Sequence, residues 1–119
     1  MTRYGLMLAM FLCFSSISFG QRGAEALAHQ CNAPQTDLSR LACGSYLGGF
    51  WEALQVQSAL MPNSRVVCPP EEQVTTPQLT AIIVKWFSDH PPASNSSARA
   101  QVMAAFKDAF PCKNLENSK

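Results

Sequence analysis

The stretch TPQLTAIIVKWFSDHPP, residues 76–92, decides the fold that we expect for this chain. Its large apolar side chains recur at the three- and four-residue spacing of a helix with one buried face. They are Leu79, Ile82, Ile83, Trp86 and Phe87. Thr76 is expected to cap this helix with Pro77 at its first position. His90 is expected to end it, because a residue before proline avoids helical backbone angles.

A second helix is predicted downstream of a polar connector, Ala93 to Ser97, which offers several capping side chains. Pro111 ends this helix just before Cys112. Its apolar face carries Ala98, Val102, Ala105, Phe106 and Ala109. The tail from Lys113 to Lys119 is expected to fray, as chain ends commonly do.

Two further helices are predicted upstream. Gly23 to Gln30 is rich in helix formers and should end near Cys31, since a proline follows closely. A longer helix should run to about Leu60, with Asp37 or Ser39 as its cap. Its apolar residues at helical spacing are Cys43, Tyr46, Leu47, Phe50 and Leu54.

Three glycines in the longer helix, Gly44, Gly48 and Gly49, each cost about 1 kcal/mol relative to alanine. Close approach of a neighbouring helix would explain them. A phosphate-binding loop is excluded, because no strand precedes the glycines and no Lys-Ser/Thr pair follows.

The fold class that these segments predict is all-α, a small bundle of four to five short helices. Met61 to Thr75, with prolines at positions 62, 69 and 70, is expected to be a loop. No window shows sustained two-residue alternation, so no strand is predicted. A chain of 119 residues forms at most one such domain.

The first twenty residues have the features of a signal peptide. Arg3 is followed by a short apolar run, Leu6 to Phe14, and Ser18-Phe19-Gly20 has the spacing of a cleavage site. We expect cleavage after Gly20, which leaves residues 21–119 as one exported domain. A signal anchor is the alternative, although the run is shorter than the about 20 residues that span a bilayer.

Removal of the leader takes away Cys13 and leaves Cys31, Cys43, Cys68 and Cys112. An even set in a short exported chain indicates two disulfides. A zinc site is the alternative, but no pair has close Cys-x-x-Cys spacing. Short connectors make successive helices antiparallel neighbours, so their adjoining ends share one end of the bundle. This geometry predicts the disulfides Cys31–Cys43 and Cys68–Cys112.

Composition favours recognition of a protein over catalysis. The chain has nine basic and eight acidic residues without a basic cluster, which nucleic acid or an anionic membrane would require. Four half-cystines leave no thiolate for a cysteine hydrolase. Glu71 and Glu72 adjoin in a loop, which is typical of a solvated turn. We therefore expect no catalytic residue, no cofactor and no metal, and place Trp51, Trp86 and Phe87 in the core.

Four segments, in this order, resemble the Rap/Tai immunity proteins of type VI secretion, which protect bacteria from peptidoglycan amidase effectors. They are CGSYLGG (43–49), Cys68-Pro69, Gln78 to Pro91 and Ala105 to Lys113. Ser45 departs from the glycine common there. The resemblance implies a helical protein in the periplasm of a Gram-negative bacterium, with a homodimer possible. It also implies that a protruding loop plugs the active-site cleft of an amidase.

Two connectors suit that task, Met61 to Thr75 and Asp89 to Ser96. Paired prolines stiffen both, which lowers the entropy lost on insertion into a cleft. We favour the second and expect Asp89, His90 and Asn95 to contact the partner. The alternatives are a small periplasmic stress chaperone, a helical binding module with an unrelated protein partner, and an enzyme of unrecognised type.

Overall fold

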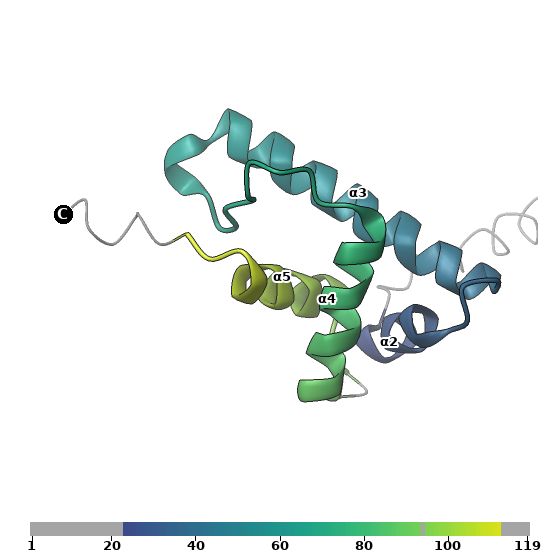
Figure 1. Cartoon of the computed structure of the whole chain (residues 1–119). Helices are drawn as coiled ribbons and strands as arrows, with labels where there is room; N and C mark the ends of the chain where they lie inside the picture. The colour runs from purple at the N-terminus through teal and green to yellow at the C-terminus, as the bar shows by residue number, and fades with distance from the viewer. Residues whose placement is uncertain (1–22, 94, 113–119) are drawn as a thin grey trace, which may run out of the picture.

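A computed structural model describes residues 23–93 and 95–112 of the chain. This part is helical, and the all-α prediction is confirmed (Figure 1). Its elements are α2 (Ala24–Asn32), α3 (Leu38–Leu60), the 3-10 turn η1 (Pro62–Ser64), α4 (Thr76–Asp89) and α5 (Ala98–Ala109). The predicted leader, residues 1–20, and the predicted frayed tail, residues 113–119, lie outside the described residues. Within those residues, no helix is long and apolar enough to cross a membrane.

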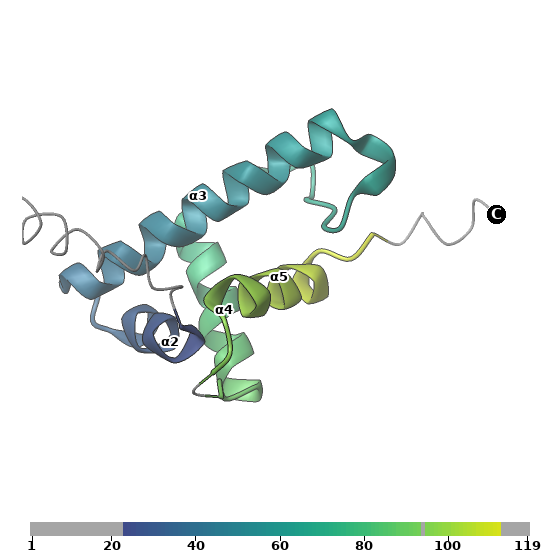
Figure 2. The ribbon, with the colours of Figure 1, turned by 180° about the vertical axis from the view of Figure 1, so that it is seen from behind.

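The long helix α3 lies along one side of the molecule, with α2, α4 and α5 packed against its other side (Figures 1 and 2). Helices α2 and α4 each contact the other three helices, so both lie at the middle of the bundle. The second half of α3 and η1 extend beyond α4, and the chain then returns to the start of α4. Each of the four helices contributes fully buried side chains to one core.

Helix caps fix where the elements begin. The Asp37 carboxylate accepts a hydrogen bond from the Ser39 backbone N–H at 2.7 Å, so Asp37 is the cap of α3. The Ser97 hydroxyl accepts one from the Ala100 N–H at 3.3 Å and caps α5. Such side chains satisfy N–H groups that have no partner inside a helix.

The predicted cap of α4 was wrong by one residue. Thr75 is the cap, and Thr76 is already helical. The Gln78 N–H donates to the Thr75 hydroxyl at 3.4 Å, and the Thr75 N–H donates to the Gln78 side chain at 2.8 Å. This reciprocal capping box satisfies two N–H groups, which a cap at Thr76 would not do.

Aromatic rings fill the space between α3 and α5. Trp51 lies with its ring centroid 5.4 Å from that of Phe106 and 4.9 Å from that of Phe110. Trp51 and Phe87 are buried, as the sequence predicted, and Trp86 is half-buried at the edge of the core. Large rings therefore hold these two helices together.

Both predicted disulfides are confirmed. Cys31–Cys43 joins the end of α2 to the start of α3 with a Cα–Cα distance of 5.1 Å. Cys68–Cys112 joins the connector before α4 to the segment after α5 at 5.0 Å. The Cys68 N–H also donates to the Phe110 carbonyl at 3.0 Å, so this connector is fixed beside the end of α5.

Close approach of a neighbouring helix was expected to explain the three glycines of α3, and it explains one of them. A Cβ on Gly44 would lie 3.0 Å from Cγ2 of Thr76, so α4 does approach α3 closely there. A Cβ on Gly48 would make only an ordinary contact, at 3.9 Å. A Cβ on Gly49 would meet nothing within 4 Å, so the contacts of α4 give no reason for this glycine.

Ala109 was wrongly predicted to lie on the buried face of α5. The side chain is exposed, whereas Ala98, Val102, Ala105 and Phe106 are buried. Ala109 borders a depression of about 210 Å³ between α4 and α5. Helix α4 does not cover the last turn of α5, so the apolar spacing continues past the core.

Candidate protein-binding surface

The connector between α4 and α5, residues 90–97, is anchored at the end that precedes α5. The Ser96 carbonyl accepts a hydrogen bond from the Ala24 N–H at 2.9 Å, which ties the connector to the start of α2. The Ser96 N–H and hydroxyl both donate to the Ala93 carbonyl. The connector starts at the end of α4 that points away from α3 (Figures 1 and 2).

Asp89 ends α4 with an exposed carboxylate. Lys85 Nζ lies 2.6 Å from its Oδ2, in an i, i+4 ion pair. The hydrogen bond from Lys85 holds the pKa of Asp89 below its ordinary value. The group is therefore an anion at neutral pH and presents acceptor oxygens at the surface.

His90 is held in place by its contact with Trp86. The two rings stack with centroids 3.8 Å apart and planes 20° apart. Nδ1 of His90 lies 3.2 Å from the Trp86 carbonyl, which can only accept, so Nδ1 donates. Nε2 is the ring nitrogen that remains for another partner. Trp86 is itself fixed because its Nε1–H donates to Gln101 Oε1 of α5 at 3.0 Å.

The structure brings together two of the three predicted contact residues. Asp89 and His90 line the depression between α4 and α5, together with Lys85 and Asp108. Asn95 is exposed in the turn before α5 and does not line that depression. The three side chains are exposed, which a contact with another protein requires.

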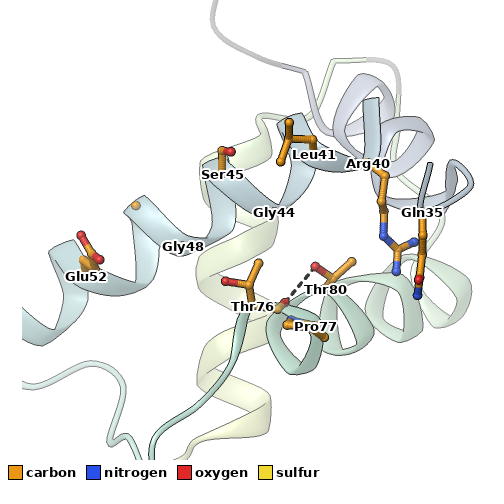
Figure 3. A pocket seen from close by; sticks show the side chains of 11 residues that line it. Gln35, Arg40, Leu41, Gly44, Ser45, Gly48, Glu52, Thr76, Pro77 and Thr80 are labelled. Atoms are coloured by element: carbon orange, nitrogen blue, oxygen red, sulfur yellow. Dashed lines mark hydrogen bonds between the residues drawn. The ribbon is translucent and has the colours of Figure 1, made fainter. Parts of the chain in front are cut away.

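A groove of about 590 Å³ lies between α3 and the start of α4 (Figure 3). Arg40, at one end, donates hydrogen bonds to the carbonyls of Cys31 and Ala33 and so satisfies the C-terminal end of α2. The Thr80 hydroxyl donates to the Thr76 carbonyl at 2.9 Å. The hydrogen-bond donors of Arg40 and Thr80 therefore already have partners within the protein.

The rest of the groove is uncharged except for Glu52. Residues of α3 form one wall, with Leu41, Ser45 and Glu52 directed along the outer side of the helix in Figure 3. This surface was not predicted from the sequence. A signal was present, because Arg40 and Glu52 are the only charged residues of a helix of 23 residues.

The described residues, 23–93 and 95–112, contain no group of side chains arranged to hold a metal ion. No three of their histidine, cysteine, aspartate and glutamate side chains gather closely enough to hold a metal ion. The four cysteines between residues 31 and 112 are joined in disulfides.

The family model of the Rap1a immunity proteins matches residues 23–112 of this chain. The chain belongs to this family. The match begins at the cap of α2 and ends at the last disulfide cysteine, so it spans all the described helices of this Rap1a-family protein. Membership implies an effector protein as the partner. Searches of curated proteins and of solved structures return no match.

Proposed function

We propose that this Rap1a-family protein works in the periplasm, where it binds a peptidoglycan amidase effector of type VI secretion and plugs its active-site cleft. The family match over residues 23–112 carries the proposal. The two disulfides support it, because disulfides form and persist in oxidising compartments such as the periplasm. The predicted signal peptide over residues 1–20 supports the same location.

The α4–α5 connector is the surface that we propose for the effector. Asp89 offers an anionic acceptor and His90 a ring whose position the Trp86 stack already fixes. Asn95 adds an amide that can both donate and accept. Since the connector is tied to α2 and capped onto α5, little conformational entropy is lost when it is bound.

Protection of bacteria tests the proposal. A strain made to export a type VI peptidoglycan amidase effector of the same bacterium should lyse, and export of this protein with it should prevent lysis. The triple variant Asp89→Ala, His90→Ala, Asn95→Ala should lose protection while its periplasmic level stays normal, because the contacts with the amidase are removed.

A matched triple variant in the other connector serves as the control. Asn63→Ala, Glu71→Ala and Glu72→Ala change three side chains that are equally exposed, and protection should be retained. If this variant fails and the first one protects, the Met61 to Thr75 connector is the contact. If the unchanged protein is exported and folded but gives no protection against the amidase, the proposed function is wrong.

A further inference from the structure

The two disulfides of this chain differ in their access to solvent. Cys31 and Cys43 are 0% exposed, and the Cys31 carbonyl accepts a hydrogen bond from Arg40, so the bundle covers this bond. Cys68 and Cys112 are both partly exposed, one in the connector before α4 and the other after the last turn of α5. A reagent in solution can therefore reach the second disulfide in the folded protein, whereas it reaches the first when α2 leaves α3.

The Cys68–Cys112 disulfide fixes a segment that has few other anchors, residues 65–74. One backbone–backbone hydrogen bond joins this segment to other described residues, from the Cys68 N–H to the Phe110 carbonyl at 3.0 Å. Val67 is its one buried side chain, at 1% exposed, and most of the other positions are exposed. The covalent bond is therefore the main link between this segment and the end of α5.

We propose that Cys68–Cys112 is a site of thiol–disulfide exchange in the folded protein, where a dithiol reductant opens it while the other disulfide stays closed. A thiolate of the reductant attacks one sulfur, so a mixed disulfide forms and the second sulfur leaves as a thiolate. The other thiolate of the reductant then attacks the mixed disulfide and releases the remaining cysteine. The reductant loses two electrons and two protons and becomes a disulfide, and Cys68 and Cys112 become thiols.

Opening of this disulfide changes the order of residues 65–74. The buried Val67 side chain and the hydrogen bond from Cys68 remain as anchors among the described residues. A segment with so few contacts opens locally without unfolding of the helices. The redox state of Cys68 and Cys112 thus sets whether the connector before α4 is fixed or mobile.

The exchange is independent of the proposed binding of an effector. The α4–α5 connector is tied to α2 by the hydrogen bond from the Ala24 N–H to the Ser96 carbonyl, and the Ser97 hydroxyl caps α5. This connector starts at the end of α4 that points away from α3 (Figures 1 and 2). The test of the exchange needs no effector, so each proposal can fail without the other.

A titration with dithiothreitol, a small dithiol, tests the exchange. The protein is produced with its native leader, purified with both disulfides oxidised, and incubated without denaturant before free thiols are trapped with N-ethylmaleimide. Peptide mapping should show Cys68 and Cys112 labelled at a dithiothreitol concentration about tenfold or more below that which labels Cys31 and Cys43, because access limits exchange. Labelling of both pairs together, of Cys31 and Cys43 first, or of neither pair until denaturant is added would overturn the proposal.

Limited digestion of the trapped protein with trypsin tests whether the change stays local. Arg65 is the only lysine or arginine between residues 53 and 84. Cleavage after Arg65 should be about tenfold faster than in the oxidised protein, whereas initial cleavage after Lys85, inside α4, should stay unchanged. Faster cleavage at both sites would show general unfolding, and unchanged cleavage at Arg65 would show that the segment stays fixed. Either result would overturn the proposal.

A variant without this disulfide shows whether the reductant acts through it. Cys68→Ser with Cys112→Ser should be cut quickly after Arg65 before any treatment, and the same dithiothreitol concentration should cause no further increase. Circular dichroism checks that its helices are intact, and if they are not, the labelling of the unchanged protein decides alone. A further increase in a folded variant would contradict the assignment to Cys68–Cys112.

Discussion

The two faces of α3 are apolar for different reasons. The inner face, with Cys43, Leu47 and Trp51, is buried against the other helices and fixed by a disulfide. The outer face carries Leu38, Leu41 and Leu60, whose side chains stay 80%, 65% and 75% exposed. The comparison teaches that helical spacing of apolar residues does not by itself show which face of a helix the bundle buries.

The strongest way to test this comparison is one substitution made on each face. Leu47→Ala removes a fully buried side chain and should lower the free energy of unfolding by about 2–5 kcal/mol, because it leaves a cavity. Leu41→Ala on the outer face should change the free energy of unfolding of the monomer by less than about 0.5 kcal/mol. Denaturant unfolding at low protein concentration measures both, and equal losses would refute the assignment of the faces.

The next largest loss in the free energy of unfolding is expected when the Cys31–Cys43 disulfide is removed. Replacement of both Cys31 and Cys43 by serine should lower the free energy of unfolding by about 3 kcal/mol, because the unfolded chain loses a constraint over a loop of 12 residues. Thermal unfolding of the oxidised protein and the variant measures the difference. A variant as stable as the oxidised protein would show that packing alone holds α2 on α3.

The glycines of α3 should differ by a smaller amount. Gly49→Ala should raise the stability of the monomer by up to about 1 kcal/mol, because alanine favours the helix and its methyl group meets nothing. Gly44→Ala should gain less or lose stability, since its methyl group would press on Thr76. Denaturant unfolding of the two variants measures the difference in their free energies of unfolding. A larger increase for Gly44→Ala than for Gly49→Ala would contradict the close packing of α4 against Gly44.

The smallest effect concerns the start of α3. The Ser39 N–H bonds to the Asp37 carboxylate and lowers the pKa of Asp37 below its ordinary value. A lowered native pKa means that the stabilisation is complete above the unfolded-state pKa and is lost as the pH falls through the native one. An NMR titration of the Ser39 amide should follow this loss in acid, whereas Asp37→Asn should show no such step. A native pKa at or above the ordinary value would contradict the cap.

Much of the fold could be predicted because local rules and tertiary packing agree. The spacing of Leu79, Ile83 and Phe87 identified α4, and the expected helix ends favoured one of the three possible pairings of the four cysteines between residues 31 and 112. The cap at Thr75 was missed because two adjacent threonines both suit a cap, and the side chain of Gln78 decides between them. The turn η1 was missed because three residues carry no periodicity.

The candidate surfaces were harder to predict. Ala109 was misplaced because spacing along α5 does not show where α4 stops covering it. The outer face of α3 was missed because exposure is a property of the assembled bundle, not of one helix. Asp89, His90 and Asn95 stay predictions: their exposure permits a contact with an effector, and only a partner can show one.

One measurement tests the central claim that this protein acts by binding an effector. Purified oxidised protein is titrated into the type VI peptidoglycan amidase effector that it is proposed to inhibit, and release of peptide from peptidoglycan is followed. The account predicts that activity falls linearly to near zero at one chain per amidase, and that the complex co-elutes on size exclusion. Full amidase activity at a large excess of folded protein would contradict it.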